Sequence, residues 1–256
     1  MKNVYSRSFE SAPPPRNITI ASVFNKVLCF FNKICNTSDI NFNRNKKAFT
    51  LAEVLITLGI IGIVAALTIP TLMANHRKKV VATQLKQSYS ILYNAIKISE
   101  SENGSYEYWD IPENTPNSLE IFSNKYILPY ITYLETGIAN NNNNTTININ
   151  GNEKLFYIKL VNGTTIAFHR GGGIDIYVDI NGDKKPNKAG YDQFAFLLNI
   201  SNSLSYSKGF APLGRNRVLQ SRENTLISCG KNEPWLCSAI IEFDGWEIKK
   251  DYPYRI

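Results

Sequence analysis

The feature that most constrains this chain is a stretch of 22 residues without a charged side chain. It runs from Val54 to Asn75 and reads VLITLGIIGIVAALTIPTLMAN. About 20 apolar residues, in a helix that rises about 1.5 Å per residue, cross the roughly 30 Å hydrocarbon core of a bilayer. The run is longer than the apolar core of a cleaved secretory signal, and Leu72-Met73-Ala74 lacks a small-x-small cleavage site. The sequence therefore predicts a single-pass membrane protein.

The positive charge of the chain lies mainly ahead of this run. The formal net charge is +7, and residues 1–48 contain eight Lys/Arg against two Asp/Glu, whereas the other 208 residues contain 20 against 19. Nucleic-acid binding requires a basic face interleaved with aromatic side chains. The cluster Lys184, Lys185 and Lys188 is small, and solvation explains it equally well. We therefore expect no nucleic-acid partner.

One carboxylate lies at the start of the apolar stretch. Glu53 is the acidic residue in KKAFTLAEVLITLGIIG. A carboxylate near the bilayer centre costs on the order of 3 kcal/mol, so an acidic residue there is a candidate functional residue. The alternative is that Glu53 reaches the lipid head groups or stabilises a helix N-terminus.

The sequence around Glu53 resembles the N-terminal processing motif of type IV pilins and type II secretion pseudopilins. The resemblance rests on the residues from Lys46 to Glu53, KKAFTLAE, and on the apolar run that follows. It implies that a prepilin peptidase cleaves the Ala48–Phe49 bond, that the new N-terminus of Phe49 is methylated, and that Glu53 acts in assembly. Helices of this family kink or unwind at positions that correspond to Gly59, Gly62 and Pro70. Two features depart from the family pattern, namely Ala48 in place of the usual Gly and a leader of 48 residues.

Cleavage would place a positive charge within reach of Glu53. The new N-terminus is an α-amine whose ordinary pKa is about 7.7–8.0. Residues at positions i and i+4 share one helix face, so Glu53 lies one turn from this amine. A neighbouring copy in register could pair its amine with the same carboxylate, whereas a shifted register would leave a buried charge unpaired. Glu53 is therefore expected to set the register of a helical filament.

The resemblance implies a structural subunit and not an enzyme. The chain would lie in the bacterial inner membrane with its N-terminus cytoplasmic and its head periplasmic, or extracellular in an assembled filament. The implied partners are prepilin peptidase, copies of this chain or other pilin-like subunits, and the secretion or pilus machinery. Two alternatives remain open: an anchored exported domain that does not polymerise, and a minor pilin for adhesion or DNA uptake. The chain has no nucleophile elbow, no H-E-x-x-H and no phosphate-binding Gly loop.

The helix is expected to continue beyond the membrane. Val81, Leu85, Tyr89, Leu92 and Ile96 follow at spacings of four, four, three and four residues. This spacing is typical of an amphipathic helix that covers a domain core. We expect the helix to end at Asn103-Gly104, because Gly accepts the left-handed conformation of a helix terminus.

The rest of the chain predicts an α+β head. A short helix is expected in SLEIFSNKYILPYI and another at Glu233-Pro234. The runs KLFYIKLV and TTIAFHR flank Asn162-Gly163, which predicts a β-hairpin, and GIDIYVDI and QFAFLLNI read as two further strands. We expect an antiparallel sheet packed on the long helix. The predicted parts are a leader (1–48), a membrane and assembly helix (49–75), its amphipathic continuation (76–104) and an exported head (105–256).

Four cysteines divide between the two ends of the chain. Cys29 and Cys35 lie in the leader and are expected to be reduced. Cys229 and Cys237 have seven residues between them, a spacing that fits neither C-x-x-C redox chemistry nor a zinc ribbon. The choice is between a local disulfide and two reduced thiols, and export of the head favours the disulfide.

The loop DINGDKKPNKAGYD contains alternating oxygen-bearing side chains. Asp179, Asn181 and Asp183 occupy positions one, three and five, as at the start of a calcium loop, with Asn187 and Asp192 beyond. The match then fails, because Lys184 replaces the expected Gly and Gly190 replaces the expected Glu. The sequence leaves open a calcium site or a polar turn with Asx hydrogen bonds. No other cofactor is expected.

Overall fold

The computed structural model describes residues 50–139, 147, 154–200 and 206–256. The chain divides into two units, residues 1–58 and 59–256. The predicted leader and the Ala48–Phe49 bond lie outside the described residues, as do Cys29 and Cys35.

One long helix carries both the apolar run and the amphipathic stripe. Helix α2 (Leu51–Asn103) ends at Gly104, whose φ is +80°, as predicted. Among the described residues it is the one helix long and apolar enough to cross a membrane. Gly59, Gly62 and Pro70 all lie inside this continuous helix, so the structure has no unwound turn at these three positions.

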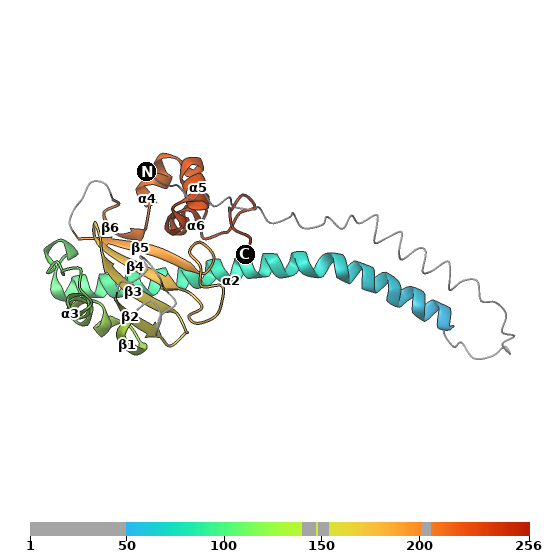
Figure 1. The fold of residues 1–256 in the computed structure, drawn as a ribbon, viewed down its shortest axis with the longest axis horizontal. Coiled ribbons are helices and arrows are strands. Elements are labelled where there is room, and N and C mark those ends of the chain that lie inside the picture. The colour runs from blue at the N-terminus through green and yellow to red at the C-terminus, as the bar shows by residue number, and fades with distance from the viewer. Residues whose placement is uncertain (1–49, 140–146, 148–153, 201–205) are drawn as a thin grey trace, which may run out of the picture. The chain divides into compact units, whose positions relative to one another are not determined.

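A six-stranded antiparallel sheet forms the centre of the head (Figure 1). Its strands are neighbours in chain order, as in a meander. They are β1 (Tyr133–Ala139), β2 (Leu155–Leu160), β3 (Thr165–Arg170), β4 (Ile174–Asp179), β5 (Gln193–Asn199) and β6 (Gly209–Pro212). The four predicted strands correspond to β2–β5, and the sequence did not predict β1 or β6, which form the two edges. The α+β fold is therefore confirmed, with two more strands than expected.

The predicted hairpin joins β2 to β3. Gly163 has a φ of +86° and donates its N–H to the carbonyl of Leu160 at 3.0 Å, while Asn162 Oδ1 accepts from the N–H of Thr164 at 3.0 Å. This turn sets a register in which Ile158 pairs with Ile166. Because side chains alternate across a strand, the register places both isoleucines on the same face.

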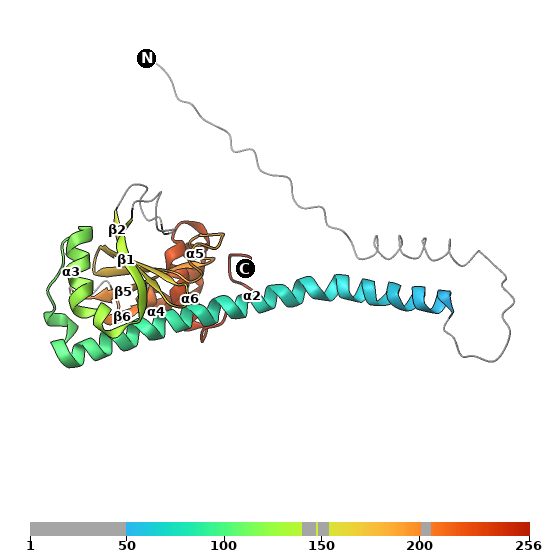
Figure 2. The same cartoon turned by 90° about the horizontal axis from the view of Figure 1, so that it is seen from below.

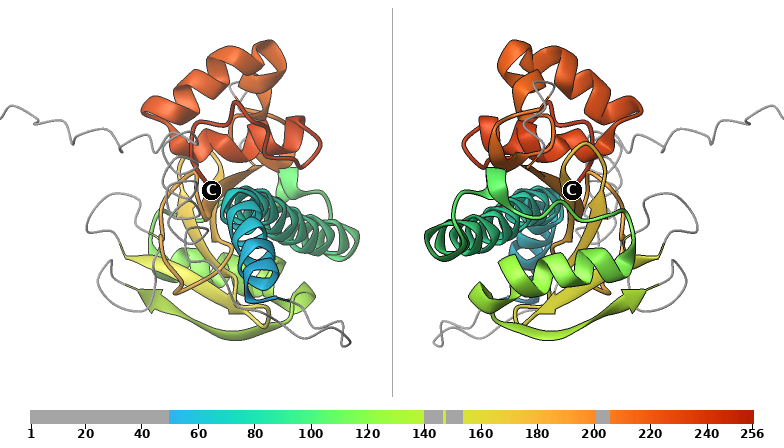
Figure 3. Two further views of the ribbon diagram at one scale, coloured as in Figure 1. Left: turned by 90° about the vertical axis from the view of Figure 1, so that its right-hand side faces the viewer. Right: turned by 90° about the vertical axis from the view of Figure 1, so that its left-hand side faces the viewer.

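Side chains along each strand point alternately to the two faces of the sheet, so that each face carries its own apolar cluster. The larger cluster joins the sheet to α2, whose Leu85, Leu92 and Ile96 are at most 1% exposed. Figures 2 and 3 show α2 running along this face. The smaller cluster includes Tyr157 and Tyr177 on the opposite face. The predicted stripe of α2 is confirmed as the cover of the head core, and Val81 and Tyr89 pack at its margin.

Short helices close the two ends of the sheet. At the β1 end, α3 (Pro116–Tyr126) begins at an N-cap, Thr115, with Pro at its first turn, and two single turns flank it, η1 (Tyr106–Tyr108) and η2 (Leu128–Tyr130). At the β6 end lie α4 (Arg215–Gln220), α5 (Arg222–Lys231), η3 (Pro234–Leu236) and α6 (Cys237–Phe243). The expected helices near residue 120 and at Pro234 are present, whereas α4 and α5 were not predicted.

Candidate functional site at the start of the apolar helix

Glu53 is held by Thr50 at the first turn of α2. The backbone N–H and the hydroxyl of Thr50 both donate to Glu53 Oε2, at 2.9 and 3.0 Å. In return, the N–H of Glu53 donates to Thr50 Oγ1 at 3.3 Å. The first backbone bond of the helix, from Val54 N to Thr50 O at 3.2 Å, forms beside them.

This arrangement is a capping box. The side chain of an N-cap Ser or Thr bonds the N–H three residues on, and a Glu at that position bonds back to the N-cap N–H. Each contact satisfies a backbone donor that the helix itself leaves without a partner. Thr50 was not among the predicted site residues, although the T-x-x-E spacing ahead of an apolar run in TLAEV is the sequence signal that would have identified it.

The capping box leaves part of the carboxylate available. Both donors of Thr50 approach Oε2, and no described residue donates to Oε1. Both Thr50 and Glu53 are exposed in the structure. A carboxylate can accept hydrogen bonds at both oxygens, so Oε1 can still bind a cationic donor such as an amine.

The helix that follows presents apolar side chains outward around its whole circumference. Leu55 and Ile56 are exposed, and so are Ile60 and Ile61, Val64 and Leu72. An exposed apolar surface of this kind marks a membrane or protein interaction site. Its length and composition make α2 a candidate membrane-spanning helix.

The polar loop between β4 and β5 is folded by its own hydrogen bonds. Asp192, 2% exposed, accepts from the backbone N–H groups of Lys188 at 2.7 Å and Asn187 at 2.8 Å. Asn181 Nδ2 donates to the same carboxylate at 3.2 Å, and Asp179 accepts from Asn181 N at 3.2 Å and from Gln193 Nε2 at 2.9 Å.

These carboxylates face N–H donors, whereas calcium requires about 6–8 oxygen ligands. Asp183, the remaining acidic residue of the loop, is exposed. In the part of the chain that the structure describes, no three His, Cys, Asp or Glu side chains gather as a metal site. These hydrogen bonds are those of the polar turn, which was the other interpretation of the sequence, and calcium binding by the loop stays a prediction.

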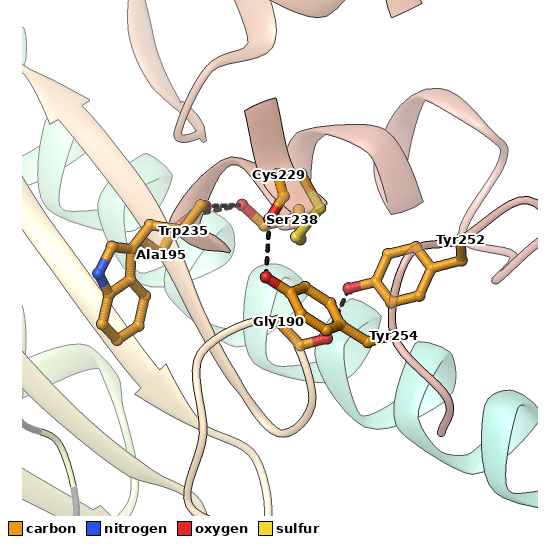
Figure 4. Close-up of a disulfide and its surroundings, with 8 residues drawn as sticks. Gly190, Ala195, Cys229, Trp235, Ser238, Tyr252 and Tyr254 are labelled. Atoms are coloured by element: carbon orange, nitrogen blue, oxygen red, sulfur yellow. Dashed lines mark hydrogen bonds between the residues drawn. A yellow bond between two sulfur atoms is a disulfide. The ribbon is translucent and has the colours of Figure 1, made fainter. Parts of the chain in front are cut away.

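Cys229 and Cys237 form a disulfide between α5 and the start of α6 (Figure 4). Their Cα atoms are 5.3 Å apart and both residues are fully buried. The hydroxyl of Tyr254 donates to the carbonyl of Cys229 at 2.7 Å, and that of Tyr252 donates to the carbonyl of Gly190 at 2.7 Å. The disulfide and the two tyrosines therefore fix the C-terminal segment to the head.

Two family models match this chain. Residues 71–256 match a family of unknown function, DUF6613. Residues 43–69 match the prokaryotic N-terminal methylation motif, the signature of type IV pilins and pseudopilins. No curated protein and no solved structure matches the chain. The second match spans both the predicted cleavage bond and Glu53, and it indicates a pilin-like protein that prepilin peptidase processes.

Proposed function

We propose that this chain, which belongs to the DUF6613 family across residues 71–256, is a structural subunit of a type IV pilus-like or type II secretion pseudopilus filament. Prepilin peptidase removes residues 1–48, the amine of Phe49 is methylated, and the subunits polymerise through α2. The head lies on the outer side of the bacterial inner membrane. It has a structural role and no catalytic one.

The observation that carries this proposal is Glu53 at the start of an otherwise uncharged membrane helix. In a plain anchor Glu53 would serve only as the cap of α2, whereas a carboxylate drawn into an apolar interior costs on the order of 3 kcal/mol near the bilayer centre and gains from an opposite charge beside it. In the single chain, Thr50 offsets part of this cost by donating two hydrogen bonds to Oε2. Oε1 retains the capacity to pair with the Phe49 amine of a neighbouring copy.

Pairing between copies explains why the charge is retained. In a filament, each copy would contribute one amine and one carboxylate, so that every charge in the apolar interior has an opposite charge nearby. Leaving one such charge unpaired by a register error is strongly unfavourable in a low-dielectric environment. The exposed apolar side chains of α2 supply the non-specific attraction, and Glu53 supplies the register.

The test replaces Glu53 by valine in the full chain and follows cleavage and assembly separately. We expect Glu53→Val to be cleaved and methylated but to yield few filaments, because the peptidase acts on the Ala48–Phe49 bond before assembly. Glu113→Val is the matched control, since it removes an exposed carboxylate from the head. Normal filament formation by Glu53→Val would contradict the proposed role of Glu53.

Two other outcomes separate the alternatives. If the processed chain remains monomeric in the membrane under conditions in which its secretion or pilus machinery is active, it is an anchored exported domain. If it enters filaments only as a rare component among other pilin-like subunits, it is a minor pilin, and adhesion and DNA uptake become the phenotypes to measure.

A further inference from the structure

A groove of about 750 Å³ lies between α2 and the turn that follows α6. Its apolar walls include Leu72 and Ala82 on the helix and Trp246 and Ile248 on the turn, and its rim carries Lys78 and Lys79. We propose that this groove binds an anionic phospholipid, with the acyl chain along Leu72 and the phosphate between Lys78 and Lys79. The inference rests on insertion of α2 in the membrane and not on polymerisation.

The position of the lysines matches the lipid head-group layer. The uncharged run ends at Asn75, and a helix rises about 1.5 Å per residue, so Lys78 and Lys79 lie roughly 5–6 Å beyond it. The head-group layer on each side of a bilayer is about 5–7 Å thick. Lys86, also on the groove, lies roughly 16 Å beyond Asn75 by the same rise and is too far out to contact a phosphate in that layer.

The charge of the groove is complementary to an anionic head group. Lys78, Lys79 and Lys86 line it together with a single carboxylate, Glu247. Among the described residues, no carboxylate forms an ion pair with any of these three lysines. A neighbouring hollow of about 350 Å³ is lined by Arg77 and Arg255 together with Pro70 and Met73. Cations at a membrane surface attract anionic lipids, and the attraction falls off within a Debye length.

The wall opposite the helix is rigidly supported. Trp246 has a φ of +65°, which is rare for a bulky residue. Its backbone N–H donates to the carbonyl of Ile241 at 2.7 Å. Its ring lies 5.1 Å from the ring of Tyr89 on α2. Figures 1 and 2 show the C-terminal end of the chain beside α2.

The test measures which lipids remain on the full chain. The chain is reconstituted in nanodiscs of equal parts phosphatidylcholine and phosphatidylglycerol, and native mass spectrometry counts the lipids that are retained. We expect selective retention of phosphatidylglycerol. Lys78→Gln/Lys79→Gln should lower the affinity for phosphatidylglycerol about five-fold per lysine. Each lysine near a membrane surface contributes about 1 kcal/mol of binding energy, which corresponds to this factor. Lys154→Gln/Lys231→Gln, which neutralises two exposed head lysines, should leave retention unchanged.

A second measurement locates the lipid. Phosphatidylglycerol with brominated acyl chains should quench the emission added by Leu72→Trp, at the membrane end of the groove, more strongly than brominated phosphatidylcholine, and Lys78→Gln/Lys79→Gln should abolish this difference. Equal retention of the two lipids, or equal losses in the two lysine variants, would overturn the proposal. The proposal would also fail if Lys78→Gln/Lys79→Gln retained as much phosphatidylglycerol as the parent chain while copies carrying Thr83→Cys formed disulfide cross-links with one another. That result would assign the groove to a neighbouring subunit. Filament formation is not a readout here, so a failure of this test leaves the proposed function standing.

Discussion

Replacing Arg222 by methionine should weaken the attachment of the C-terminal segment to the rest of the head. The guanidinium donates to Asp244 at 2.8 and 2.5 Å and to Asp251 at 2.7 and 3.1 Å. These two carboxylates lie 22 and 29 residues further along the chain. The side chain of Asp244 is only 2% exposed and that of Arg222 is 24% exposed. The interaction is therefore a buried ion pair that closes a long loop.

The expected cost follows from this burial. Removing one partner of a buried ion pair destabilises a protein by about 3–5 kcal/mol, because the other charge stays buried without compensation. Lys249 remains 2.8 Å from Asp244 and retains part of that compensation. We therefore expect Arg222→Met to lower the free energy of unfolding by about 3 kcal/mol, at the lower end of that range.

Urea unfolding of the full chain in detergent, followed by near-ultraviolet circular dichroism, measures this change. Arg217→Met is the matched control, because Arg217 donates to both oxygens of Glu233 at 2.7 and 2.9 Å while the two side chains are 43% and 46% exposed. An exposed pair of this kind contributes about 0–1 kcal/mol. Arg222→Met/Asp244→Asn should recover part of the loss, since it removes the uncompensated charge. Equal effects of Arg222→Met and Arg217→Met would show that burial does not strengthen the Arg222–Asp244 pair.

Three further predictions concern the head. Burial raises the pKa of Asp244, but the ion pairs with Arg222 and Lys249 outweigh burial and lower it, and Arg222 likewise lowers the pKa of Asp251. A lowered carboxyl pKa stabilises the head above the ordinary value of about 3.9, and this stabilisation is lost as the pH falls below it. The free energy of unfolding should therefore fall steeply in acid, and less steeply in Arg222→Met. Reducing the Cys229–Cys237 disulfide should cost about 2–3 kcal/mol, and Cys229→Ala/Cys237→Ala should be insensitive to reductant; a parent chain equally insensitive would show that the bridge does not stabilise the head. Millimolar calcium should leave the melting temperature unchanged, because N–H donors contact the carboxylates of Asp179 and Asp192. A clear rise in the melting temperature would show instead that the loop binds calcium.

The elements that could be predicted are those whose residues repeat with a clear period. The uncharged run of α2 and the stripe from Val81 to Ile96 predict one long helix, and both are present in the structure. The four inner strands β2–β5 are runs of apolar residues, and Asn162-Gly163 fixes the turn between the first two. In these segments local preference and tertiary packing favour the same conformation.

The edge strands could not be predicted from pattern. In β1 (YLETGIA) most side chains are exposed or half-buried, so there is no alternation to detect, and its pairing with β2 depends on the backbone. β6 has only four residues, one of them Pro212. Proline is tolerated in an edge strand but argues against a strand in sequence.

The candidate sites also divide into those visible in the local sequence and those that depend on contacts between distant residues. The apolar context of Glu53 makes it visible in sequence, and its contact with Thr50 lies only three residues away. The partners of Arg222 are too distant in sequence for any local signal. In the loop from Asp179 to Asp192 the residue types suggested calcium, but only the structure shows that the carboxylates turn towards backbone N–H groups.

The proposed pairing of Glu53 requires an amine at Phe49 that exists only after cleavage. The intact mass of the chain extracted from native membranes reports whether that amine forms, together with methylation and the disulfide. We expect a chain that begins at Phe49, carries one additional methyl group and lacks two hydrogens for the Cys229–Cys237 bond. A mass that includes residues 1–48, or an N-terminus at a different residue, would contradict it.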